Sequence, residues 1–146
     1  MVSTGGREQG RRAREYLRVS LDRSGRARSL DEQHADNERV AGGQGWELEE
    51  AAYRDESVSA SRYARKARGG FEALIEELER DRFGAQVLMI WESSRDSRRV
   101  GEWVNLLGLC EQRSVFIFVT THGRCYDPAN GRDRRSLLED AVDGEY

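Results

Sequence analysis

The chain has 146 residues and a formal net charge of −3, so it can form one compact domain, but it lacks the positive charge of a domain that holds nucleic acid by overall electrostatics. No apolar run is long enough to span a bilayer and no secretory leader is visible, so we expect a cytoplasmic protein that does not contact a membrane. Two cysteines and two histidines, scattered along the sequence, are too few for a zinc site.

The first strand is the most informative segment. Residues 1–14 are rich in glycine and arginine and lack hydrophobic periodicity, which predicts a flexible basic arm. The segment EYLRVS, residues 15–20, is typical of a β-strand, yet it has Arg18 among apolar neighbours and Ser20 at its end. A buried, unpaired charge is costly, so we expect Arg18 to meet an anion. Residues two apart in a strand point to the same side, so Ser20 would face that anion too.

A helix and a weaker strand follow. Ser29 can cap a helix over about residues 30–41, and Glu32 completes a capping box. The glycine-rich stretch after it predicts the helix end. The segment WELEEAAYR, residues 46–54, is typical of a second strand. Apolar residues between 71 and 78 recur at helical spacing and predict an amphipathic helix with an acidic outer face.

The second half of the chain continues the alternation. The apolar run AQVLMIW, residues 85–91, is typical of a strand buried on both faces of a parallel sheet. A helix is predicted over residues 100–113, with Cys110 as an ordinary core residue, and SVFIFVT, residues 114–120, predicts a fourth strand. The pattern predicts an α/β fold: an open, mostly parallel twisted sheet of four or five strands with helices on both faces.

In such sheets ligands bind beyond the carboxyl ends of the strands, so the loops after the four predicted strands should meet at one edge. A hydrogen-bonded loop histidine is the expectation for His122, although it lies where it can reach a ligand. The loops are rich in hydroxyls and guanidiniums, which suit a phosphate because a planar guanidinium stays charged and bridges two phosphate oxygens. Their polar residues are Ser20, Arg23, Arg26 and Arg28; Asp55, Ser57, Ser59 and Arg68; Ser94, Arg95 and Arg98; and His122, Arg124 and Arg132.

Several phosphate chemistries lack their motifs. No G-x-x-x-x-G-K-[ST], G-x-G-x-x-G or G-x-S-x-G occurs, which disfavours P-loop, dinucleotide and α/β-hydrolase chemistry. Asp55 is nearly alone as a loop carboxylate, whereas a two-metal nuclease needs a cluster. What remains is transfer without metal or cofactor, in which a serine hydroxyl attacks phosphorus and arginines stabilise the charge of the transition state.

Four segments, taken together and in this order, carry a family resemblance: YLRVS, SLDEQ, YRDESVSASRYARKARGGFEALI and LMIWESSRDSRR. Over residues 15–146 the chain resembles the catalytic domain of serine recombinases (resolvases and invertases), most of all the large serine integrases of actinobacterial phages. The resemblance implies a resolvase-like fold with flavodoxin-type strand order and a catalytic domain over residues 15–133. Residues 134–146 would begin a long helix, cut short before the DNA-binding domains of large integrases.

The resemblance also implies roles for particular residues. Ser20 would attack a DNA phosphodiester, join the 5′ phosphate and release a 3′ hydroxyl, and strand exchange and rejoining would follow without metal or ATP. The partners implied are double-stranded DNA attachment sites and, in the full-length protein, further copies of the chain in dimers and tetramers. The family's active-site arginines match Arg18, Arg68, Arg95 and Arg98, and its supporting polar residues match Gln33, Asp55, Ser59, Ser94 and Glu145.

Two departures and two alternatives remain. Ser94 stands where small resolvases carry an aspartate, and Asp55 and Ser59 are one residue further apart than in those relatives. In one alternative Ser20 only caps a turn and Arg18 pairs with an acid such as Asp55, in a non-catalytic interaction module. In the other, the same edge serves a small phosphatase or nucleotide-binding domain. Turnover of small phosphate esters would distinguish a phosphatase from a recombinase.

Overall fold

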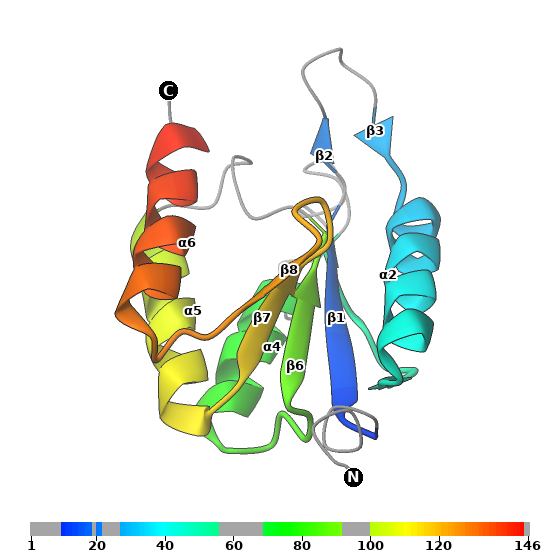
Figure 1. The fold of residues 1–146 in the computed structure, drawn as a ribbon, viewed down its shortest axis with the longest axis horizontal. Helices are drawn as coiled ribbons and strands as arrows, with labels where there is room; N and C mark the ends of the chain where they lie inside the picture. Colours follow the sequence, from blue (N-terminus) through cyan, green and yellow to red (C-terminus); the bar gives the residue numbers. More distant parts are fainter. Residues whose placement is uncertain (1–9, 19, 22–26, 56–68, 92–99, 145–146) are drawn as a thin grey trace, which may run out of the picture.

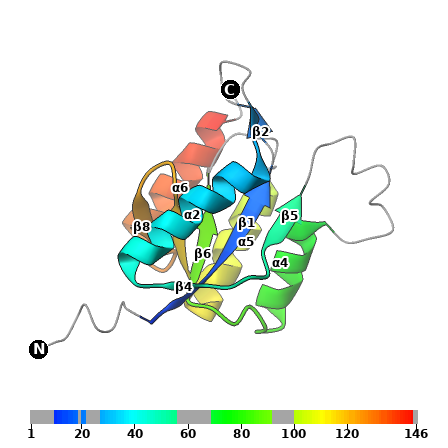
Figure 2. The same ribbon diagram turned by 90° about the vertical axis from the view of Figure 1, so that its right-hand side faces the viewer.

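The structure of the protein, a computed structural model, describes residues 10–18, 20–21, 27–55, 69–91 and 100–144. Its elements in chain order are β1 (Arg12–Arg18), β2 (Ser20–Leu21), β3 (Ala27–Arg28), α2 (Leu30–Gln44), β4 (Glu47–Leu48), β5 (Tyr53–Asp55), α4 (Gly70–Glu79), β6 (Val87–Ile90), α5 (Val100–Arg113), β7 (Phe116–Val119), β8 (Arg124–Tyr126) and α6 (Gly131–Gly144). Helix α2 lies against one face of the main sheet, whereas α4 and α5 cover the other, with α6 beside α5 (Figures 1 and 2). The predicted α/β fold with helices on both faces is confirmed.

The main sheet has six strands in the order β4-β1-β6-β7-β8, and β5 pairs with the second half of β1. Its pairings are parallel except that β8 runs antiparallel to β7. The second strand segment thus lies on one side of β1, and β6 and β7 lie on the other, which is the flavodoxin-type order expected. Strands β2 and β3 form a separate antiparallel pair.

Two strand predictions differ from the structure. The single strand expected over residues 46–54 is two short strands, because the register on β1 changes from Arg12↔Glu47 to Tyr16↔Tyr53 and the residues between bulge out of the ladder. Strand β8 lies in a segment predicted to be a loop. It has only three residues, too few to show a periodicity, and its pairing with β7 is what defines it.

The ends of three elements also differ from the prediction. Strand β1 begins at Arg12, inside the segment expected to be an arm. Helix α2 runs through two glycines to Gln44, and Gly45 ends it in the left-handed conformation with φ 76°. Helix α6 begins at Gly131 rather than near residue 134, because the side chain of Asn130 accepts hydrogen bonds from two backbone N–H groups of its first turn. The predicted capping box of α2 is confirmed, with Ser29 and Glu32 bonded reciprocally.

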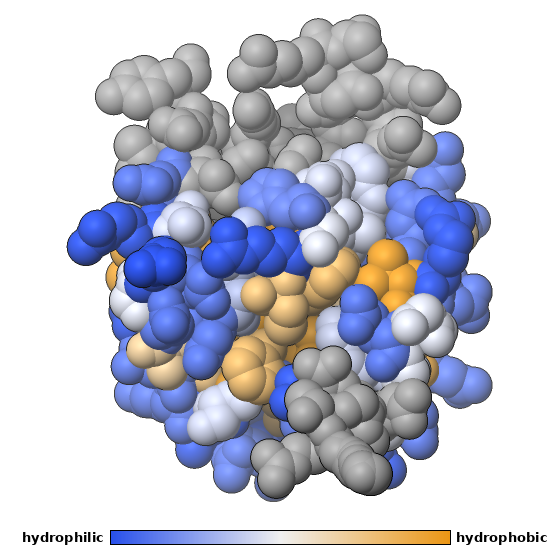
Figure 3. Space-filling model, in the orientation of Figure 1, coloured by the Kyte–Doolittle hydropathy of each residue, from blue (hydrophilic) through white to orange (hydrophobic). Residues whose placement is uncertain are grey.

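The larger apolar core lies between the sheet and helices α4, α5 and α6. Cys110 of α5 is fully buried there, as expected, and burial raises the pKa of its thiol to about 12. On the α2 side the buried apolar cluster is small and consists of Ala13, Ala41, Val87, Met89 and Phe118. On the face seen in Figure 3, apolar side chains are visible in a central area bordered by hydrophilic ones.

Because little apolar surface is buried on its side, α2 docks on the sheet through polar contacts. Glu15 of β1 is only 1% exposed, and its carboxylate accepts a 2.9 Å hydrogen bond from Asn37 Nδ2 and contacts Nδ1 of His34. Asn37 in turn accepts a hydrogen bond from the hydroxyl of Thr120, just after β7. A carboxylate removed from water requires such partners, so these bonds fix the position of α2 along β1.

The two cysteines provide a test of the core. In the native protein, iodoacetamide should alkylate the exposed Cys125 and leave Cys110 unmodified, because Cys110 is buried and its raised thiol pKa leaves almost no thiolate near pH 8. Mass spectrometry of peptides locates the adducts, and in denaturant both sites should react. Rapid alkylation of Cys110 in the native protein would contradict this packing of α5.

The buried carboxylate provides a second test. Asn37→Leu should lower the free energy of unfolding by about 3 kcal/mol, because a buried carboxylate loses a donor. The double variant Glu15→Leu/Asn37→Leu should lose less than Asn37→Leu alone, since apolar replacement of both partners removes the uncompensated charge. Denaturant unfolding gives both values. A larger loss in the double variant would show that the unpaired Glu15 carboxylate is not what destabilises Asn37→Leu.

Candidate functional site at the carboxyl edge of the sheet

The carboxyl ends of the parallel strands meet at one edge, as expected. The last residue of β1, Arg18, is in register with Asp55, the last residue of β5. On the other side, β1 pairs with β6 through Tyr16↔Ile90, and Ile90 is in register with Val119. The chain therefore leaves β1, β5, β6 and β7 on the same side of the molecule, at the top in Figure 1.

Gln33 fixes the end of β1. Its side-chain Nε2 donates a 2.6 Å hydrogen bond to the carbonyl oxygen of Arg18, and the backbone N–H of Arg18 donates to Gln33 Oε1 at 3.3 Å. Gln33 is itself 2% exposed and lies in the first turn of α2, which the capping box holds in place. The amide thus acts like a short piece of neighbouring strand for Arg18, two residues before Ser20.

The charges of β1 are distributed differently from the prediction. Arg18 is partly buried, and the expectation that its guanidinium meets an anion stays a prediction. The fully buried charge of this strand is Glu15. The strand's alternation accounts for the burial of Glu15: Arg14 and Tyr16 point to the α4 side, and Glu15 points with Ala13 toward α2.

Ser20 pairs with a strand outside the main sheet. It begins β2, which pairs with β3 in the register Ser20↔Arg28, in a projection above the main sheet (Figure 1). The Ser20 side chain lies outside what the structure describes, so the expectation that it shares a side with Arg18 stays a prediction. The following predicted site residues lie outside the described ranges altogether: Arg68, Arg95, Arg98, Ser59, Ser94 and Glu145.

Asp55 holds the start of α4. Its two carboxylate oxygens accept hydrogen bonds from the backbone N–H groups of Gly70 at 2.6 Å and Phe71 at 3.0 Å, and the hydroxyl of Tyr16 donates to Oδ2 at 2.6 Å. The N-cap residue, Gly69, has no side chain to cap the helix, so Asp55 from β5 supplies the cap. A Cβ at Gly70 would lie 2.5 Å from the backbone of Arg54, which explains the glycine.

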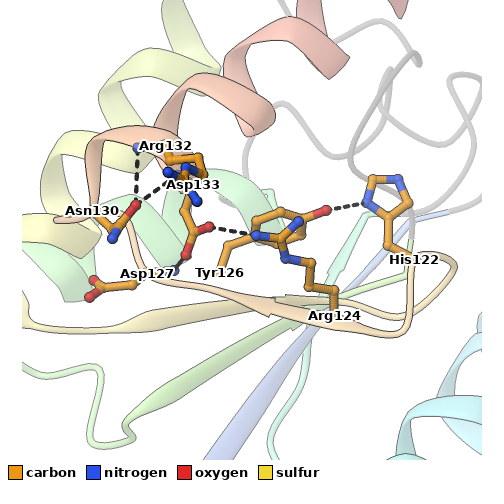
Figure 4. Close-up of polar contacts among 7 residues, drawn as sticks. All are labelled: His122, Arg124, Tyr126, Asp127, Asn130, Arg132 and Asp133. Carbon is orange, nitrogen blue, oxygen red and sulfur yellow. Dashed lines mark hydrogen bonds and ion pairs between the residues drawn. The ribbon is translucent and has the colours of Figure 1, made fainter.

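A corner after β7 holds the start of α6 (Figure 4). Nδ1 of His122 lies 2.9 Å from the hydroxyl of Tyr126, so the expected hydrogen-bonded loop histidine is confirmed. Arg124 lies over the Tyr126 ring and donates a 2.8 Å hydrogen bond to Asp133. Asp133 also accepts from the backbone N–H of Asp127. These contacts connect the β7–β8 hairpin to α6, a role that the sequence analysis missed.

The described part of the chain contains neither a metal-ligand cluster nor a membrane-spanning helix. Within it, no three His, Cys, Asp or Glu side chains are grouped so that they could hold a metal ion. In the same residues, no helix combines the length and apolar character needed to cross a membrane.

The Asp55 contacts make a prediction about α4. Asp55→Ala should lower the free energy of unfolding by about 2 kcal/mol, because the helix start loses its cap and Tyr16 loses its acceptor. Tyr16→Phe, which removes one of these bonds, should lower it by about 1 kcal/mol. Urea unfolding measures both changes, and equal stability of Asp55→Ala and the parent protein would contradict the assignment.

Comparison with known proteins identifies relatives. A family model described as "Resolvase, N terminal domain" matches residues 13–141. The crystal structure of a resolvase family site-specific recombinase from Streptococcus pneumoniae is similar, with a TM-score of 0.63 and 18% sequence identity over 92% of this chain and 87% of that chain. At that identity the likeness shows a shared fold. A comparison with curated protein sequences gave no significant match.

Proposed function

This chain belongs to the family of resolvase N-terminal domains, and on that premise we propose that it is the catalytic domain of a site-specific DNA recombinase of the phage integrase type. The observation that carries the proposal is the edge where Gln33 holds the backbone of Arg18, two residues before Ser20 and beside the end of β5. A nucleophile acts efficiently only when its approach is fixed, and the bonds of Gln33 fix the backbone that leads to Ser20.

In the proposed reaction Ser20 Oγ attacks the phosphorus of a DNA phosphodiester. The serine–phosphorus bond forms as the bond to the 3′ oxygen breaks, the serine proton is lost, and the leaving oxygen takes up a proton to become a 3′ hydroxyl. Rejoining reverses these steps with the 3′ hydroxyl of a new partner strand. The phosphoserine ester retains the energy of the original bond, so neither ATP nor a metal is needed.

Four arginines are proposed to stabilise the negative charge that develops on the phosphate: Arg18, Arg68, Arg95 and Arg98. Guanidiniums suit this task because they remain protonated and bind two oxygens at once. The remaining residues proposed to support the site are Gln33, Asp55, Ser59, Ser94 and Glu145. For Asp55, the bonds to the start of α4 point to a positioning role for β5 and α4 rather than to proton transfer.

The proposals of an integrase type and of its partners are supported by the four sequence segments that resemble the family. We propose a cytoplasmic protein whose catalytic unit spans residues 15–133, and whose following helix leads toward DNA-binding domains. Double-stranded attachment sites would be the substrate, and copies of the protein would associate from dimers to tetramers. The chain's net charge of −3 is consistent with DNA being held mainly by other modules.

Ser20→Ala in the full-length protein should abolish the covalent protein–DNA adduct and leave binding of attachment-site DNA nearly unchanged, because attack depends on one oxygen. Denaturing electrophoresis of an end-labelled duplex detects the adduct, and gel shift measures binding. The matched control is Ser114→Ala, in the turn between α5 and the amino end of β7 and so away from the carboxyl edge, which should form the adduct normally. Adduct formation by Ser20→Ala would refute the role of Ser20, and hydrolysis of p-nitrophenyl phosphate by the parent protein would favour a phosphatase.

A further inference from the structure

One face of α2 is hydrogen-bonded to the ends of three strands. Gln33 bonds the backbone of Arg18 at the end of β1. One turn further along, Asp36 and Asn37 each bond a side chain that lies just beyond β6 or β7. Asp36 Oδ2 accepts a 3.0 Å hydrogen bond from the indole Nε1 of Trp91, and Asn37 accepts one from the hydroxyl of Thr120.

The strand ends are also bonded to one another. The backbone N–H of Thr120 donates to the carbonyl oxygen of Ile90, and that of Thr121 donates to the carbonyl oxygen of Trp91, both at 2.9 Å. These bonds tie the two residues that follow β7 to the end of β6. Trp91 is therefore fixed at two points, by its backbone to β7 and by its indole to α2.

The Asp36 carboxylate is held from two sides. Its Oδ2 accepts from Trp91, whereas its Oδ1 pairs with the guanidinium of Arg39 on the next turn. The Asp36 side chain is 30% exposed, so the bond to the indole is partly shielded from water and is stronger than a bond on an open surface. Aspartate is a poor residue for the interior of a helix, and the bond to Trp91 gives it a function there.

We propose that Asp36 and Trp91 are positioning residues for strand cleavage. Their hydrogen bond holds the end of β6 against α2, the same helix whose Gln33 holds the end of β1. The inference rests on the proposed function. In the sequence, Trp91 leads directly to Ser94 and Arg95, two residues proposed for the site. A single rigid helix would then set the separation between the strand that leads to the nucleophile and the strand that leads to these residues.

Hydrogen exchange measures the positioning without reference to catalysis. In the full-length protein, Trp91→Phe removes the indole donor and keeps an aromatic ring, and Asp36→Ala removes the acceptor. Both should speed amide exchange at Thr121 by about tenfold, as expected when a hydrogen bond to a charged group is lost. Arg39→Ala removes only the ion pair of Asp36 and should leave this exchange rate unchanged.

Strand cleavage measures the consequence. At saturating attachment-site DNA, Trp91→Phe and Asp36→Ala should form the covalent adduct about 10- to 100-fold more slowly, while DNA affinity and melting temperature stay close to those of the parent protein. Asp36→Asn keeps an oxygen that accepts from the indole and should retain most of the rate. Arg39→Ala should cleave normally.

Three results would overturn the inference: unchanged exchange at Thr121 in both Trp91→Phe and Asp36→Ala, faster exchange with a normal cleavage rate, or slow cleavage by Arg39→Ala with normal cleavage by Trp91→Phe. The last would assign the effect to the ion pair. Failure of the proposed function looks different, because the parent protein would then form no Ser20-dependent adduct. In that case exchange alone decides whether Asp36 and Trp91 position the end of β6.

Discussion

Glu15 lies in β1, next to the centre of the sheet, with 1% of its surface exposed, and its carboxylate is bonded to two residues of one helix. The cost of leaving a carboxylate without donors in a protein interior is several kcal/mol, which is large compared with the small apolar cluster on this side of the sheet. The position of α2 is therefore determined by where Asn37 and His34 must be to meet Glu15. Apolar packing alone would tolerate small shifts, whereas hydrogen bonds to a charged group do not.

The rest of the candidate site follows from that placement. With Asn37 fixed on Glu15, Gln33 one turn earlier reaches the backbone of Arg18, and Asp36 reaches Trp91. The opposite face of the sheet is held differently, by a large apolar core and by Asp55, which bonds the start of α4. The carboxyl edge is thus supported from both faces, by a polar helix on one side and by an apolar layer with one charged cap on the other.

The corner after β7 extends this support to the last helix. The ion pair of Arg124 with Asp133 and the bond from the backbone N–H of Asp127 to Asp133 bring β8 and the start of α6 together, and Arg124 also lies over the Tyr126 ring. If α6 continues toward DNA-binding modules, as we propose, its direction relative to the edge is set by this corner. The contacts are near the surface, with the Arg124 side chain half exposed, so each adds little to the free energy of unfolding. Together they fix the start of α6 against the hairpin.

The sequence by itself determined the class of fold, the strand–helix alternation, the capping box of Ser29 and Glu32, and the edge at which the strands end, because these depend on local periodicity and on rules for parallel sheets. The buried state of Cys110 and the bonded state of His122 followed from the same local signals. The tertiary structure decided which charge of β1 is buried, since the strand carries charged residues on both of its faces and either face can be covered by a helix. Alternation with Ala13 and Leu17 was the available signal for Glu15, but only the packed helix shows that Asn37 and His34 are its partners. The roles of Asp36 and Asp55 were decided in the same way: each bonds a group far away in the sequence, and hydrogen bonds between distant segments leave no periodic pattern.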